Sequence, residues 1–186
     1  MTSWRPDFQP EHLYFITTKA VDYAHLFRRD VVKRLLLDTF DCFRQQKRMK
    51  LFCFVIMPNH FHCIAQFSAE CTMADAIRDF KRHTADRFIR QLKAENNKTT
   101  LDWLASKVSR PDKQLLKVWE DDYVAKDVVT ENFLWQKMEY IHSNPCQSHW
   151  QLSERPEDYL WSSARFYHTD QPCMVPIDDV RKIGTM

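Results

Sequence analysis

The expected fold is organised around residues 54–65, which read Phe-Val-Ile-Met-Pro-Asn-His-Phe-His-Cys-Ile-Ala. An apolar run typical of a strand is interrupted by Met-Pro-Asn and resumes with two histidines around one phenylalanine. Because successive strand side chains point to opposite faces, His60 and His62 share one face and Phe61 points to the other. Two imidazoles on one face are half of a metal site; the alternative is a pair of histidines hydrogen-bonded at a sheet end.

The two halves of this stretch predict two strands, at residues 51–57 and 60–67, joined by Pro58 and Asn59 alone. A connection this short fits either an antiparallel hairpin or one sharply bulged strand. Proline fixes φ and asparagine tolerates the left-handed region, so both suit a turn. In either arrangement the histidines lie where a strand begins, near one end of the sheet.

Composition restricts the class of protein. The chain has 186 residues, 44% hydrophobic and 13% aromatic, as expected of a globular domain with a sizeable core. It has one glycine, Gly184, which excludes the glycine-rich phosphate loops of P-loop and Rossmann proteins. The net charge is only +2, so any surface that binds nucleic acid must be local. We expect one domain over 1–186, with its core at about 13–165 and a loosely attached tail at about 170–186.

The cysteines and the apolar runs predict a cellular location. Six cysteines without a Cys-x-x-Cys pair, and a first segment that is not followed by an apolar signal region, indicate reduced thiols in a cytoplasmic protein. The longest uninterrupted apolar run, Leu51–Met57, is too short to cross a bilayer, so we expect no membrane partner.

Apolar periodicity and capping residues predict the remaining elements. In chain order these are a strand at 13–18, a helix from Asp30 toward Lys50, a helix at 72–93, a short helix at 101–108, a strand at 115–120 and a helix at 131–144. The chain contains neither an internal repeat nor a linker, which favours a single α+β domain.

The last of these helices carries a second set of candidate functional residues. Tyr140 and Asn144 are four residues apart, about one turn, and therefore share a face. Together with the two histidines they suggest that imidazoles and an amide oxygen bind a divalent cation that polarises a phosphodiester, which the Tyr140 oxygen attacks. The alternatives are a half-buried helix tyrosine and an asparagine that ends a helix before Pro145. His142 points away from Tyr140 on an ideal helix and is assigned to packing.

The helix at 72–93 has a basic face. Arg78, Lys81, Arg82 and Arg90 are candidates for contact with DNA phosphates, which would make binding strongly salt-dependent. The alternative is an ordinary solvated helix surface.

Five short segments match the motifs of a known family, in the same order along the chain, and together they span most of it. These segments are Val55–His62, Phe80–Thr84, Trp119–Tyr123, Tyr140–Pro145 and Asp158–Ser163. In these segments the sequence resembles the REP-associated tyrosine transposases, relatives of the single-strand insertion-sequence transposases within the His-hydrophobic-His endonuclease superfamily. The chain departs from the family after Pro145, where Cys146–Trp150 lacks the usual glycine.

The resemblance implies a ferredoxin-like antiparallel sheet with helices packed on one face, the histidines on a central strand and the tyrosine on a helix beside it. Carried over to this sequence, it makes His60 and His62 metal ligands, Tyr140 the nucleophile and Asn144 the third ligand. It places the segment that contains Lys81 and Thr84 near the DNA.

The resemblance also implies an activity. We expect a Mg²⁺- or Mn²⁺-dependent endonuclease and strand-transferase that acts on single-stranded DNA with hairpin or repetitive palindromic elements, forms a 5′-phosphotyrosine, and associates with the nucleoid as a monomer or homodimer. One alternative is a module that binds DNA hairpins without cutting them. Another is a phosphohydrolase that uses the same histidines with water as the nucleophile.

Overall fold

Four strands rich in apolar residues form one antiparallel sheet in the computed structural model, which describes residues 6–183. The strands are β1 (Leu13–Lys19), β2 (Met49–Ile56), β3 (His60–Phe67) and β4 (Val124–Val128). Their order across the sheet is β2-β3-β1-β4, and every neighbouring pair is antiparallel. The α+β class, the ferredoxin-like sheet and the central position of the histidine strand are therefore confirmed.

The helices are α1 (Asp30–Gln45), α2 (Met73–Ala94), α3 (Lys98–Ser106), α4 (Glu131–Ser143) and α5 (Ala164–Thr169). Short 3-10 turns occur at Val21–Tyr23, Asn144–Cys146, Pro156–Asp158 and Val180–Lys182. Two of these helices begin at threonine caps: the Thr72 side chain accepts a hydrogen bond from the Asp75 amide, and that of Thr130 accepts one from the Phe133 amide.

The stretch around Pro58 is a hairpin, which decides between the two alternatives left by the sequence. In its register Val55 lies opposite His62, and a bulge interrupts β2 only farther away, between Leu51 and Cys53. Backbone hydrogen bonds from other segments fix the turn. The Phe27 amide donates to the Pro58 carbonyl at 2.8 Å, and an amide just after β1 donates to the Asn59 carbonyl. The start of β3 is therefore fixed in place.

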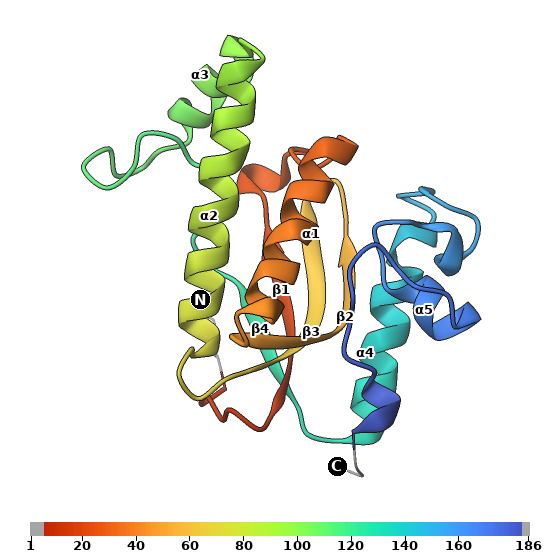
Figure 1. The fold of residues 1–186 in the computed structure, drawn as a ribbon. Helices are drawn as coiled ribbons and strands as arrows, with labels where there is room; N and C mark the ends of the chain where they lie inside the picture. The colour runs from red at the N-terminus through yellow and green to blue at the C-terminus, as the bar shows by residue number, and fades with distance from the viewer. Residues whose placement is uncertain (1–5, 184–186) are drawn as a thin grey trace.

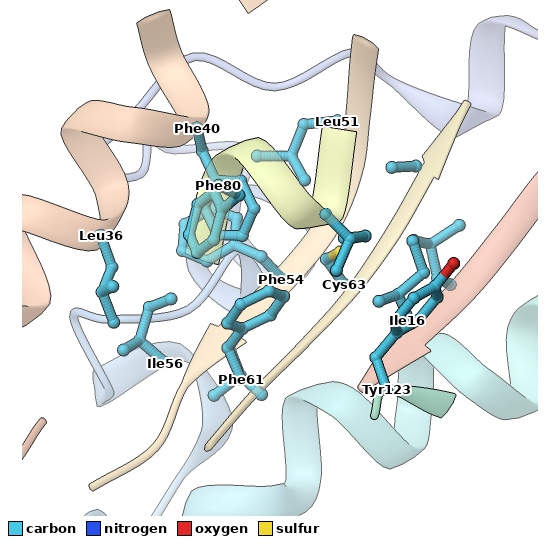
Figure 2. Close-up of a cluster of buried hydrophobic side chains, with 14 of the residues drawn as sticks. Ile16, Leu36, Phe40, Leu51, Phe54, Ile56, Phe61, Cys63, Phe80 and Tyr123 are labelled. Carbon is cyan, nitrogen blue, oxygen red and sulfur yellow. The ribbon is translucent and has the colours of Figure 1, made fainter. Parts of the chain in front are cut away.

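One face of the sheet carries the main aromatic core. Helices α1 and α2 lie side by side over this face (Figure 1). Phe61 points into this layer, and its ring centroid lies 5.1 Å from that of Phe40 and 5.1 Å from that of Phe80 (Figure 2). The expected layer of helices on one face thus consists of α1 and α2.

Helix α4 packs against the opposite face of the sheet. Its stripe of Leu134, Met138 and Ile141 is buried, as the apolar spacing predicts. Since β3 side chains alternate, the face that α4 covers is also the face of His60 and His62. The hairpin register and the apolar stripe of one helix together bring the histidines and the tyrosine helix to the same side.

Two predictions about elements are wrong. Residues 115–120 do not form a strand: Leu115 is 79% exposed, and Trp119 makes only an isolated bridge to Ala20. The expectation of a loosely attached tail is also wrong over residues 175–180, where Val175 and Val180 are buried and Asp178 bonds the backbone of β2.

Two further findings concern the cysteines and the helices. All six cysteines are free thiols, as predicted. In the part of the chain that the structure describes, no helix has both the length and the apolar character that a membrane span requires.

Candidate active site

His62 lies on the face of the sheet that it shares with His60, here called the histidine face, and is almost fully buried. Its Nδ1 is 2.7 Å from the Thr17 hydroxyl on the neighbouring strand β1, directly opposite in register. Its Nε2 is buried and has no hydrogen-bond partner among the described residues. If Nδ1 carries the proton and donates it to Thr17, the lone pair on Nε2 is left available for a metal ion.

The ring of His60 is also oriented by a hydrogen bond at its Nδ1. Its ring centroid is 4.6 Å from that of His62, and its Nδ1 is 2.6 Å from Asn59 Oδ1. The Asn59 amide nitrogen donates to the Tyr23 carbonyl at 3.1 Å, which fixes the orientation of the amide group. Because Oδ1 can only accept, His60 Nδ1 must be the donor, and its Nε2 is also left with a lone pair.

Burial keeps both imidazoles neutral. It lowers the pKa of His60 to about 4, helped by the charges of Lys19 and His149. It lowers the pKa of His62 well below its ordinary value, helped by His60 and Lys137. Neutral imidazole is the form that binds metal ions, so at neutral pH both rings are ready to act as ligands.

Tyr140 lies beside this pair. The buried stripe of α4 places it on the flank of the helix, where the side chain is 41% exposed. Its ring centroid is 5.1 Å from that of His62 and 6.0 Å from that of Phe15. A hydroxyl on a half-exposed ring next to the histidines can meet a ligand that arrives from solvent.

Asn144 directly follows α4 and begins the 3-10 turn Asn144–Cys146. It is 3% exposed, and its Oδ1 is buried without a hydrogen-bond partner among the described residues. Tyr140, one turn earlier, contacts His62, and Trp150, shortly after the helix, has its ring centroid 6.0 Å from that of His60. In the sequence, Asn144 lies between these two residues that contact the histidine pair.

Imidazole nitrogens and an amide oxygen are donor types that a divalent cation accepts. Among residues 6–183 no group of three or more His, Cys, Asp or Glu side chains could hold a metal ion, so the candidate donors are two imidazoles and one amide oxygen. Two of these side chains carry a buried polar atom without a partner, an arrangement that costs free energy unless a ligand compensates it. A neutral three-donor set would bind a cation weakly and leave positions for phosphate oxygens and water.

The predicted DNA-contacting residues are located elsewhere, on α2, which covers the other face of the sheet. Arg78 pairs with Asp75 and Asp79, Arg82 pairs with Asp79, and Arg90 pairs with Asp86. The structure therefore does not bring these three arginines to the histidines.

The other two predicted DNA-contacting residues have structural partners. Lys81 donates from Nζ to the carbonyl oxygens of residues 120, 121 and 122. Thr84 is buried, where its hydroxyl donates to the Phe80 carbonyl and accepts from the Trp119 indole at 3.1 Å. Lys81 fixes a loop, and Thr84 does not offer its hydroxyl to solvent.

His142 is a packing residue, as predicted. It is buried, with its Nε2 3.2 Å from the Cys53 sulfur and 2.9 Å from the Ser163 hydroxyl. Burial lowers its pKa to about 3, with a smaller effect from His168.

Sequence reasoning did not assign Thr17, Phe15, Lys137 or Trp150 to the site. Alternation along the first strand places Phe15 and Thr17 on one face, but only the pairing of β1 with β3 shows that this is the histidine face. Lys137 shares a helix face with Tyr140, a signal visible in the sequence. Trp150 follows an irregular turn, and no periodic pattern predicts its position.

The fold is ferredoxin-like, with two histidines on one strand and a tyrosine on the helix beside them. Residues 12–144, more than half of the chain, match the family described as IS200-like transposases. The chain belongs to this family, which gives it a transposase-like role in DNA processing.

Two solved structures are similar to the chain. A REP-associated tyrosine transposase bound to a REP hairpin shares 13% identity at a TM-score of 0.62, covering 100% of this chain and 96% of the other, and it supports the fold alone. A candidate transposase from Deinococcus radiodurans R1 shares 20% identity over 76% of this chain and 95% of the other, but its TM-score of 0.44 is too low to support a conclusion. No curated protein matches the sequence significantly.

Proposed function

We propose that the chain is a divalent-metal-dependent endonuclease and strand-transferase that cleaves single-stranded DNA beside hairpin or repetitive palindromic elements. The observation that carries this proposal is the position of the half-exposed Tyr140 ring, 5.1 Å from the His62 ring, whose Nε2 is buried without a partner. The REP-hairpin complex of the similar transposase supports a hairpin as the class of DNA.

In this proposal His60, His62 and Asn144 hold Mg²⁺ or Mn²⁺. The ion would supply Lewis-acid polarisation of the phosphodiester and would favour removal of the phenol proton. The two imidazoles are held for this task by Thr17 and Asn59, which orient the rings and keep each Nε2 lone pair available.

Tyr140 is the nucleophile. Its hydroxyl oxygen attacks phosphorus, the bond between phosphorus and the 3′-oxygen breaks, and this oxygen takes up a proton to become a free 3′-OH. The 5′-phosphate of the downstream fragment remains on the tyrosine. One phosphodiester replaces another, so a 3′-OH can later attack the phosphotyrosine and rejoin DNA, which hydrolysis would prevent.

A gel assay tests the proposal. Hairpin-bearing single-stranded oligonucleotides, labelled at either end, are incubated with the protein and Mn²⁺ or Mg²⁺ and separated under denaturing conditions. We expect a protein-linked downstream fragment that disappears with chelator and in Tyr140→Phe. Cleavage that survives in Tyr140→Phe would indicate water as the nucleophile, and tight hairpin binding without any cleavage would indicate a binding module.

A further inference from the structure

Lys137 is a second functional candidate on the tyrosine helix. It lies three residues before Tyr140, and its side chain is half-buried. Its Nζ is 5.1 Å from the ring centroid of Phe15, 5.1 Å from that of Phe133 and 5.6 Å from that of Tyr140. Phe15 in turn stacks on His62 with centroids 5.5 Å apart. The ammonium group is thus held on the side of α4 that faces the candidate metal ligands.

Lys137 has another cation as a charged neighbour. Its pKa is lowered by burial and by the neighbouring cation Lys126, and no carboxylate of residues 6–183 contributes. Lys126 is paired with Phe15 in the sheet register, so its side chain is on the histidine face as well. By contrast, the α2 arginines Arg78, Arg82 and Arg90 each have an aspartate partner.

A partly desolvated cation that has aromatic rings and another cation as neighbours gains free energy when an anion arrives. The hydroxyl of Tyr140 is about one helical turn away, a separation of about 5 Å along the axis. A flexible lysine side chain can span this separation, so a phosphate close enough for attack by Tyr140 is also within reach of Nζ.

We propose that Lys137 binds a non-bridging oxygen of the phosphodiester that Tyr140 attacks, and so acts as a catalytic residue beside the metal ligands. This inference rests on the proposed cleavage function. Negative charge on the non-bridging oxygens is redistributed in the transition state, and a cation fixed in advance stabilises that arrangement without reorganisation. Lys137 is therefore expected to contribute more to the cleavage rate than to DNA affinity.

The first test compares cleavage rates at saturating DNA. Lys137→Met keeps the apolar stem against the rings and removes the charge, and we expect the rate of adduct formation to fall on the order of tenfold to a hundredfold. Lys137→Arg is expected to recover most of this loss. Lys47→Met is the matched control, since this exposed lysine lies in the turn before β2, at the sheet end opposite His60, and its rate should stay at that of wild type.

Thermal unfolding of each variant separates loss of charge from loss of fold. If Lys137→Met unfolds, Lys137→Gln replaces it in the same comparison. A folded neutral variant that forms the adduct at the wild-type rate would overturn the assignment.

The second test does not depend on cleavage. Affinity for single-stranded DNA is measured against salt concentration, in chelator, for Tyr140→Phe and for Tyr140→Phe with Lys137→Met. Loss of one phosphate contact reduces the slope of log K against log salt by about 0.7. If wild type forms no adduct but the slope falls, the cleavage proposal fails and the phosphate contact stands; an unchanged slope contradicts the contact.

Discussion

In the proposed metal site, the hydroxyl of Thr17 would orient the His62 ring, because it lies 2.7 Å from His62 Nδ1. Thr17→Val removes this hydrogen bond and keeps the shape and β-propensity of the side chain. We expect Mn²⁺ affinity to fall about tenfold to a hundredfold, as is usual when the partner of a metal-binding histidine is lost. Titration calorimetry would measure it.

The neighbouring Thr18 is the matched control. Its hydroxyl is buried without a hydrogen-bond partner among the described residues, and alternation points it to the opposite face of the sheet. Thr18→Val should therefore leave Mn²⁺ affinity unchanged. Equal effects of the two substitutions would show that the strand, rather than the hydrogen bond, is responsible.

Asn144 provides a prediction that separates a metal ligand from a simple helix terminator. Asn144→Ala removes a buried oxygen that has no partner, so the metal-free protein should lose little or no stability. If the proposed metal site is correct, Mn²⁺ should raise the Tm of wild type, because a ligand that binds only the folded state stabilises it. This increase should be smaller in the variant. A variant destabilised equally with and without Mn²⁺ would instead assign Asn144 to ending the helix.

At the scale of elements, the C-terminal segment protects the edge strand β2. The Leu51 amide donates to the Asp178 carboxylate at 3.0 Å, and the Asp178 amide donates to the Leu51 carbonyl at 2.7 Å. Arg44 of α1 bonds the same carboxylate at 3.2 Å. Such contacts cover unpaired backbone groups that would otherwise be open to pairing with another chain.

Asp178→Ala should therefore destabilise the protein by about 1 to 3 kcal/mol, the usual cost of leaving buried partners without a hydrogen bond. Urea unfolding measures this change. Asp112→Ala, in an exposed turn, is the comparison, and we expect it to have almost no effect. If both variants unfold at the same urea concentration, the segment does not stabilise β2.

The elements also show where sequence patterns succeed. Helices α2 and α4 follow from apolar spacing and threonine caps, because most of the information that defines them is local. The fourth strand does not: Leu115–Glu120 has stronger strand composition than Val124–Val128, yet the latter pairs with β1. A segment becomes an edge strand because it pairs with a neighbouring strand, and local composition does not encode this pairing.

At the scale of the whole molecule, the division of the sheet into two faces explains what could be predicted about the site. The shared face of His60 and His62 follows from alternation, and that of Tyr140 and Asn144 follows from helix geometry. That the two sets meet depends on α4 crossing to the opposite face from α1 and α2, which periodicity alone does not fix. The resemblance to a family supplied that step. Contact between the arginines of α2 and DNA stays a prediction, and the structure places α2 beside α1, on the face of the sheet opposite the histidines.

The buried histidines should also make the whole molecule sensitive to acid. The pKa of His142 is lowered to about 3, and that of His62 is well below its ordinary value. In the unfolded chain histidines take up protons near pH 6.5. Above that pH neither state binds these protons, whereas below it only the unfolded state does, so stability must fall as pH decreases.

Each of these two histidines should lower the free energy of unfolding by about 1 to 2 kcal/mol between pH 7 and pH 5, a range above the titration of most carboxylates. Urea unfolding of the metal-free protein at several pH values in this range measures the slope. His142→Gln should reduce the slope, and His83→Gln, at an exposed position of α2, should leave it unchanged. Stability that does not vary between pH 7 and pH 5 would mean that the histidines accept protons in the folded protein, and that the site is more open to water than its burial indicates.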